Sequence, residues 1–454
     1  MSLDKGGDSM KRSFTWVFVG MLVAVFLVDS AFAGIIQTDE AEKWASENGK
    51  ARQSFSFIVF GDNRPTSPTR PLPEVLDIIL KEISLIRPDF AVNIGDLIWG
   101  YFGTPKQARD EFSAFTKRVD KYTPDVDMLF VAGNHDTPSE EIQRIYRELF
   151  GQKLYYNFTF GNSHFVMIDT NFPRSLLEKG QKYGFYNVND GEHELAMVDW
   201  TKKVLGQNAE HTFVFGHVPV FSALTPDFGE HPKSFTTRGN RDDLLKLLLE
   251  KKISAYFAGH EHIFYAQSVG ETKFFTLGGG GAPLYGPTTG GYSINTGEGP
   301  DYKTLKSDPA IEHGGHAKGH HYDLHFPAGA LSIFSYMLVT VDRDKVSYNL
   351  MVPHSFEVTY LKGNDGISLE SSVVIANTTP YEWTLRGVTF LMPYSEGGYE
   401  ASGSHVGFRD WKAKPAKVAP EILEVEKVSD SLAKVRVMAT IPGSNSIDVF
   451  LKVK

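Results

Sequence analysis

The chain has 454 residues, of which 41% are hydrophobic and 22% charged, which is the length and composition of a folded protein with a sizeable core. Its formal net charge of −9 at pH 7 does not favour nucleic-acid binding through bulk electrostatics. The lack of cysteine excludes disulfides, thiolate metal ligands and cysteine nucleophiles.

The N-terminal residues have the pattern of a secretory signal. Lys11 and Arg12 precede a short apolar run over residues 14–28, and the triplet Ala31-Phe32-Ala33 follows. We therefore expect residues 1–33 to be a cleaved signal peptide and the mature protein to be periplasmic or extracellular. No transmembrane segment would then remain after cleavage. An uncleaved anchor is the alternative, because the apolar character continues past the expected cleavage point.

A polar stretch over residues 34–54, with one short helix, is expected to link the signal to the first folded element. Short apolar runs that end at polar residues then alternate with stretches of helical periodicity, which predicts an α/β fold. The predicted strands cover residues 55–60, 90–94, 128–132, 165–168, 212–215, 253–257, 274–277, 336–341 and 345–352. The predicted helices cover residues 74–86, 139–150, 192–205 and 242–251.

The sequence texture changes near residue 355. Short alternating runs separated by turn residues follow, without a strong helical pattern. We expect an α/β domain over residues 55–354 and an all-β sandwich domain over residues 355–454.

Potential metal ligands gather directly after the predicted strands, where α/β sheets bind ligands. Their carboxylate, amide and imidazole groups suit Fe, Mn and Zn ions. Each motif is weak alone, because a Gly-Asp after a strand is often only a turn. Their ordered succession favours a functional site. The motifs are Gly61-Asp62, Gly95-Asp96-Leu97, Gly133-Asn134-His135-Asp136, Gly216-His217 and Gly259-His260-Glu261-His262.

This ordered set resembles the calcineurin-like metallophosphoesterase family over about residues 55–352. The resemblance implies a two-sheet α/β sandwich with its metal site at the strand ends. It also implies a cofactor of one or two divalent or trivalent ions, with Mn, Fe and Zn favoured. Asp62, Asp96 and His262 would hold the first metal, Asp96 would bridge to the second, and Asn134, His217 and His260 would complete the second.

The resemblance assigns further roles near the substrate. Asn134 would also lie near the substrate, and His135, oriented by Asp136, would protonate the leaving group. The expected reaction is hydrolysis of a phosphomonoester or phosphodiester by a metal-activated hydroxide. The alternative is a non-catalytic metal-binding or scaffold protein of the cell envelope that keeps the phosphoesterase fold.

The first motif departs from the family pattern of Asp-x-His. Here it reads Asp62-Asn63-Arg64, and arginine has no lone pair to offer a metal. The first metal therefore lacks one ligand. Arg64 is expected either to bind the substrate phosphate through its planar fork or to form a structural salt bridge, and the sequence favours neither.

Two further segments border the predicted site. The glycine-rich run over residues 278–281 lacks the lysine of a phosphate-binding loop, which favours a tight turn. The segment over residues 284–327 is rich in Gly, Thr, Asp and His. It is a candidate substrate lid, because loops of such length are often functional.

Overall fold

The computed structural model describes residues 34–101, 103–171, 193–220, 240–285, 321–323, 331–379, 381–407 and 416–454. The predicted signal peptide lies outside the described residues, as does most of the candidate lid. Among the described residues, no helix has both the length and the apolar character needed to cross a membrane.

The first sheet has six strands in the order β10-β12-β11-β1-β2-β3. β1 pairs in parallel with β2, and β2 pairs in parallel with β3, whereas β11 is antiparallel to β1. The strands are β1 (Ser54–Phe60), β2 (Phe90–Asn93), β3 (Met128–Phe130), β10 (His321–Asp323), β11 (Tyr336–Asp342) and β12 (Lys345–Met351). β11 and β12 form the predicted hairpin.

The second sheet also has six strands, in the order β4-β5-β6-β7-β9-β8. Its four central strands are parallel, and each edge strand is antiparallel to its neighbour. The strands are β4 (Tyr156–Phe160), β5 (Ser163–Met167), β6 (His211–Phe215), β7 (Ala255–Ala258), β8 (Phe264–Val269) and β9 (Thr272–Leu277).

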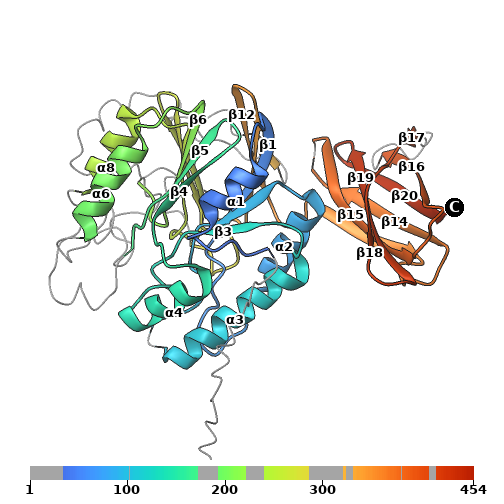
Figure 1. The fold of residues 1–454 in the computed structure, drawn as a ribbon, viewed down its shortest axis with the longest axis horizontal. Coiled ribbons are helices and arrows are strands. Elements are labelled where there is room, and N and C mark those ends of the chain that lie inside the picture. Colours follow the sequence, from blue (N-terminus) through green and yellow to red (C-terminus); the bar gives the residue numbers. More distant parts are fainter. Residues whose placement is uncertain are drawn as a thin grey trace, which may run out of the picture. The chain divides into compact units, whose positions relative to one another are not determined.

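The two sheets pack face to face between layers of helices, as Figure 1 shows. Alternate side chains of β1 point to opposite faces. Phe57 and Val59 enter the core between the sheets, whereas Ile58 and Phe60 pack in the cluster that holds the helices of the first sheet. Those helices are α2 (Glu74–Ile86), α3 (Pro105–Tyr122) and α4 (Glu140–Phe150), and α6 (His193–Val204) and α8 (Asn240–Glu250) lie along the second sheet.

One feature differs from the sequence prediction: helix α3 was not predicted, although Thr104 and Gln107 form a capping box at its start. The short helix expected within residues 34–54 is present as α1 (Ala41–Asn48). It packs through Trp44, which is buried in the core between the sheets. The Trp44 indole also donates to Asp127 at 2.7 Å.

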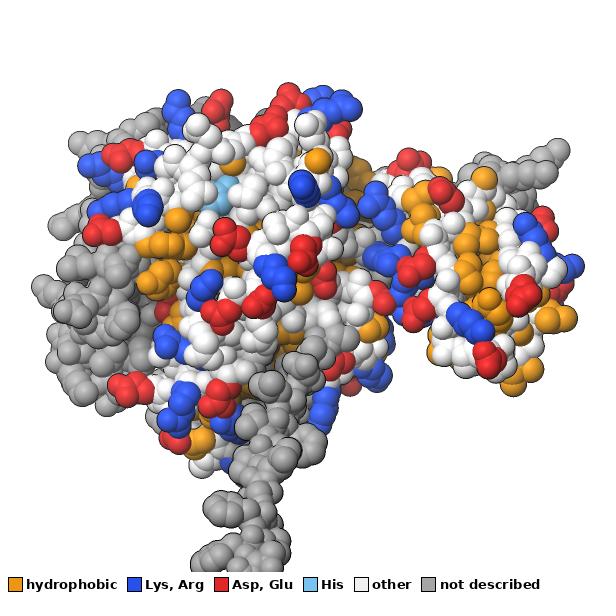
Figure 2. Space-filling view, in the orientation of Figure 1, with side chains coloured by type: hydrophobic (Ala, Val, Ile, Leu, Met, Phe, Trp, Pro, Cys, Tyr) orange, Lys and Arg blue, Asp and Glu red, His pale blue; other side chains and the backbone are white. Residues whose placement is uncertain are grey.

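After Ser355 every described element is a strand, in two sheets ordered β13-β14-β20-β16-β17 and β15-β19-β18. The fold is thus a two-sheet α/β sandwich followed by antiparallel β-sheets. On the face seen in Figure 2, acidic and basic side chains are interspersed. The strands are β13 (Phe356–Lys362), β14 (Glu370–Asn377), β15 (Trp383–Pro393), β16 (Tyr399–Gly407), β17 (Ala416–Val418), β18 (Glu421–Lys427), β19 (Leu432–Ile441) and β20 (Asn445–Val453).

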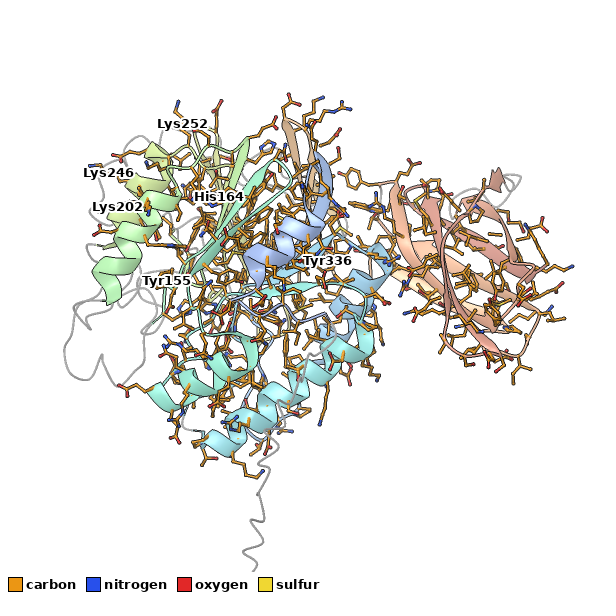
Figure 3. The ribbon with its side chains drawn as sticks, in the orientation of Figure 1. Tyr155, His164, Lys202, Lys246, Lys252 and Tyr336 are labelled. Atoms are coloured by element: carbon orange, nitrogen blue, oxygen red, sulfur yellow. The ribbon has the colours of Figure 1, made fainter. Side chains whose placement is uncertain are left out.

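A buried carboxylate on helix α2 binds the first residues of β11 and β13. Glu82 on α2 is 3% exposed and accepts hydrogen bonds from the Tyr336 hydroxyl at 2.9 Å and the Phe356 amide at 3.0 Å. Tyr336 is labelled in Figure 3. Burial raises the pKa of Glu82 to about 7.

Candidate metal centre

All six predicted ligands lie just beyond the carboxyl ends of parallel strands. In each sheet these ends lie on one edge, so residues far apart in the sequence meet there. Every one of the six side chains is buried. Asp62 follows β1, Asp96 follows β2, Asn134 follows β3, His217 follows β6, and His260 and His262 follow β7.

The backbone at this edge is strained and crowded. Asp62, Asp96 and His260 have φ angles of 58°, 58° and 69°, in the left-handed region that side-chain-bearing residues rarely adopt. Two motif glycines let the carboxylates approach the backbone. A Cβ on Gly133 would lie 2.2 Å from Asp96 Oδ1, and a Cβ on Gly259 would lie 2.2 Å from Asp62 Oδ2. These contacts explain why glycine stands before the ligands in both motifs.

Asn134 lies at the middle of one group of ligands. Its Oδ1 is 2.8 Å from His260 Nδ1 and 3.0 Å from His217 Nε2, and His217 Nε2 is 3.3 Å from Asp96 Oδ1. The Asn134 Nδ2 group donates to the Tyr101 hydroxyl at 2.9 Å, which turns Oδ1 toward the histidines. We call Asp96, Asn134, His217 and His260 the second-metal group.

The hydrogen bonds of His217 test whether this group fits a metal. Its Nδ1 lies 2.8 Å from the Ile94 carbonyl and donates a hydrogen bond to it, which makes Nε2 the ring atom that can bind a cation. Nε2 faces the Asn134 Oδ1 and Asp96 Oδ1 atoms. Imidazole, amide and carboxylate are suitable ligands for a metal cation. The second-metal group therefore fits a metal ion.

A second cluster comprises Asp62, Asp96 and His262, whose ligand atoms lie within 4.8 Å of one another. His262 Nδ1 is 2.7 Å from the Pro283 carbonyl, which leaves Nε2 free to face Asp62 Oδ1 at 3.5 Å. Both Asp62 oxygens accept from the His260 amide. We call these three residues the first-metal group, and they are the ligands that the sequence predicted for it.

Burial at the centre disfavours the ionised forms of Asp62 and Asp96. Burial and the neighbouring Asp96 raise the pKa of Asp62 well above its usual range. Burial acts on Asp96 in the same direction, but electrostatic interactions with His217, His135 and Arg64 and the hydrogen bond from the His135 amide outweigh it and lower the Asp96 pKa. Burial also lowers the pKa of His262 to about 3. A bound cation would favour the ionised carboxylates and the neutral imidazole.

Arg64 lies inside the centre. The side chain is buried, its Nε is 3.6 Å from Asp96 Oδ2, and its guanidinium carbon is 5.0 Å from the centre of the Trp99 ring. It also donates a hydrogen bond to the Tyr285 hydroxyl. Of the two roles expected for Arg64, the structure shows the salt bridge. Its partner, Asp96, is itself a predicted metal ligand.

His135 and Asp136 have different partners from those expected. The His135 Nδ1 contacts the Trp99 carbonyl, and Nε2 lies 3.9 Å from Asp96 Oδ2. Asp136 accepts the amides of Asp96, Leu97 and Gly133, each at 2.8 Å. The expectation that Asp136 orients the His135 ring is therefore wrong: Trp99 has that role, and Asp136 holds the Asp96 backbone. Burial lowers the pKa of His135 to about 4, so the ring is neutral at pH 7.

Three aromatic residues of the centre were missed by the sequence reasoning. Trp99 lies under Arg64, Tyr101 orients Asn134 and packs at 4.4 Å against the His135 ring, and Tyr285 stacks on His262 at 4.3 Å. Trp99 and Tyr101 closely follow the second motif in the sequence, and this proximity is the signal that could have placed them in the centre. Tyr285 lies in the candidate lid segment and follows the glycine-rich run.

Hydrogen bonds connect the glycine-rich run over residues 278–281 to neighbouring segments. The Gly278 and Gly280 amides donate to the Ile263 and Gly61 carbonyls, at 3.0 and 2.9 Å. Asn63 Nδ2 donates to the Gly280 carbonyl at 3.0 Å. These bonds agree with the predicted turn and fix it against the first motif.

Residues 55–264 match the family of calcineurin-like phosphoesterases. This part of the chain is a calcineurin-like phosphoesterase domain. The match ends just after His262, so it includes all six predicted ligands. Enzymes of this kind hydrolyse phosphoric esters with metal ions, so the reaction class and the metal cofactor follow for the phosphoesterase domain. No curated protein is similar enough in sequence to count as a match.

Several solved structures resemble the chain. GAP50, the anchor in the inner membrane complex of Plasmodium, shares 13% identity, with 67% of this chain and 86% of that chain covered and a TM-score of 0.44. The purple acid phosphatase PPD1 from yellow lupin seeds shares 15%, with 72% and 52% covered and a TM-score of 0.45. A dimetal phosphatase from Danio rerio shares 14%, with 66% and 100% covered and a TM-score of 0.37. Similarities this distant carry no argument about function.

Proposed function

We propose that the chain is an exported phosphoesterase that hydrolyses phosphomonoesters or phosphodiesters at the metal centre. The observation that carries the proposal is the second-metal group, in which Asn134 Oδ1 and Asp96 Oδ1 converge on His217 Nε2, at 3.0 and 3.3 Å. Asp96, Asn134, His217 and His260 would hold the ion. Once bound, a metal would neutralise phosphate charge and lower the pKa of a water molecule.

The chain's own residues would position the substrate and handle a proton. The Arg64 guanidinium and the Asn134 amide lie on the same centre and present N–H donors of the kind that phosphate oxygens accept. His135 Nδ1 is held at the Trp99 carbonyl, so proton exchange takes place at Nε2. A bound phosphate anion beside the ring would raise the His135 pKa, and Nε2–H would then donate to the departing oxygen.

A metal screen tests the proposal. Purified protein is stripped of metal, reconstituted with Mn, Fe or Zn, and assayed with p-nitrophenyl phosphate and bis-p-nitrophenyl phosphate, which separate monoesterase from diesterase activity. We expect hydrolysis of at least one ester with at least one metal, and loss of it in Asp96→Asn. No turnover of any ester with any metal would contradict the proposal.

The export part of the proposal depends on Lys11, Arg12, the apolar run over residues 14–28 and the triplet Ala31-Phe32-Ala33. Fractionation of the producing cells and N-terminal sequencing of the recovered protein test it. The expected result is a periplasmic or extracellular protein that begins after Ala33. Full-length protein in the membrane fraction would support an uncleaved anchor.

A non-catalytic scaffold is the second candidate, and the specific observation that favours it is Arg64. This residue replaces a family ligand and contacts Asp96, so the centre departs from the family pattern. Bound metal without turnover in the screen above would favour the scaffold. Turnover that depends on Asp96 would exclude it.

A further inference from the structure

We infer that the Arg64 guanidinium takes the place of the first metal, so that the centre holds a single ion in the second-metal group. The inference rests on the proposed metal site but not on turnover. It concerns the two oxygens of Asp96, which face different neighbours. Oδ1 lies 3.3 Å from His217 Nε2, on the side of the second-metal group, and Oδ2 lies 3.6 Å from Arg64 Nε.

The oxygen that would bridge to a first metal therefore already has a cation beside it. A metal ion bound to Asp96 Oδ2 at about 2.1 Å would lie within about 6 Å of the Arg64 Nε atom. Two cations at such a distance repel each other strongly in a buried site. One divalent ion and Arg64 together already carry more positive charge than Asp62 and Asp96 carry negative charge. An ion in the first-metal group is thus not required to balance the charge of the two carboxylates.

Arg64 is also held firmly in this place. Trp99 packs against the guanidinium, the Tyr285 hydroxyl accepts a hydrogen bond from it, and its Nη1 donates to the Pro65 carbonyl at 3.3 Å. Tyr285 in turn stacks on His262, a ligand of the first-metal group. The Arg64 Nε is buried without a hydrogen-bond partner of its own and lies on the Asp96 side. An arginine bound in this way is a fixed part of the centre.

The two groups also differ in their ligands. The second-metal group offers four ligand side chains, and its two histidine nitrogens lie 3.0 and 2.8 Å from the Asn134 Oδ1 atom. The first-metal group offers three, and the position that would supply the fourth is arginine. The three atoms do lie within 4.8 Å of one another, so geometry alone would admit an ion there. The adjacent guanidinium is the reason to expect none.

The experiment restores the missing ligand. Wild type and Arg64→His are loaded with Mn²⁺, dialysed and analysed for metal content, with electron paramagnetic resonance as a second readout. We expect one Mn²⁺ per chain with an isolated-ion spectrum in wild type, and two with a spin-coupled spectrum in Arg64→His. Arg70→His, at an exposed position, is the matched control and should keep one ion.

Two ligand variants of the wild-type background keep the inference testable even if Arg64→His folds poorly, which circular dichroism would reveal. His217→Ala should lose the single ion, and His262→Ala should retain it. Two ions in wild type, or loss of an ion in His262→Ala, would overturn the inference. So would an unchanged content of one ion in folded Arg64→His.

The outcomes also separate this inference from the proposed function. One ion in wild type and two in Arg64→His, without turnover of any phosphoester, would support the inference and contradict the function. Two ions in wild type together with phosphoester hydrolysis would contradict the inference and support the function.

Discussion

The carboxylate of Asp136 accepts a hydrogen bond of 2.8 Å from the backbone amide of Asp96, 40 residues away in the sequence. It accepts two more from the Leu97 and Gly133 amides. The three bonds fix the turn in which Asp96 has its left-handed φ of 58°. Asp136 is therefore a positioning residue, and its role is to aim the Asp96 carboxylate at the metal centre.

Removal of the Asp136 carboxylate should destabilise the protein. Asp136→Ala leaves three amides without an acceptor, and each buried unpaired donor costs about 1–3 kcal/mol, so we expect a loss of about 3 kcal/mol or more. Asp136→Asn keeps one oxygen acceptor, so its stability should lie between those of Asp136→Ala and wild type. Denaturant unfolding measures both, with Asp110→Ala on the exposed face of α3 as a control expected to change little. Equal stability of Asp136→Ala and wild type would contradict the role.

The close approach at Gly259 predicts a specific loss of metal. In Gly259→Ala the new Cβ would lie 2.2 Å from Asp62 Oδ2, so the carboxylate and the His260 backbone must move apart. We expect weaker metal binding and turnover at least about tenfold lower, since catalysis is sensitive to misplacement of about 1 Å. Metal titration and phosphoester assays check this. Gly206→Ala, with its nearest contact at 3.2 Å, should behave like wild type.

Glu82 predicts a pH dependence of stability away from the metal centre. Its folded pKa of about 7 is raised above the unfolded value of 4.5. The stabilising contribution is thus fully present below pH 4.5 and is lost as the pH rises through 7, by at most about 3 kcal/mol. Glu82→Gln keeps an acceptor for Tyr336 and Phe356 but cannot ionise. The variant should gain stability relative to wild type between pH 5 and 8. If the free energies of unfolding of wild type and Glu82→Gln changed in parallel over that pH range, the prediction would be contradicted.

His135 predicts a dependence on the leaving group. A proton donor matters most when the departing oxygen is strongly basic, as in an alkyl phosphate. His135→Ala should therefore slow hydrolysis of an alkyl ester by about 10²–10⁴-fold and that of p-nitrophenyl phosphate much less. Steady-state rates on the two esters check it. An equal loss on both would assign His135 to binding, and no loss would remove it from the reaction.

The sequence predicted the strands and ligands of the centre well, because both have local signals. Apolar runs such as residues 55–60 became strands, and the polar residues that follow them meet at the strand ends. Helix α3 was missed even though the capping residues Thr104 and Gln107 are visible in the sequence. Its apolar residues are spread among many charged ones, which weakens the helical pattern.

Contacts between distant segments were not predictable from the sequence. The partner of Asp136 depends on the backbone of a turn formed by another motif, and no local pattern encodes it. The same holds for Arg64, whose environment of Trp99 and Tyr285 comes from segments more than thirty residues away along the chain. The sequence did show that Arg64 replaces a ligand. The structure adds that it lies next to Asp96.

The most direct test of the account compares hydrolysis by wild type and His217→Ala after reconstitution with the same metal. His217 belongs to the second-metal group and has no contact with Arg64 among the described interactions, so its loss affects the proposed ion first. We expect His217→Ala to bind no metal and its kcat/KM to fall about a thousandfold, or ~4 kcal/mol. Wild-type turnover by His217→Ala, or by metal-free wild type, would contradict it.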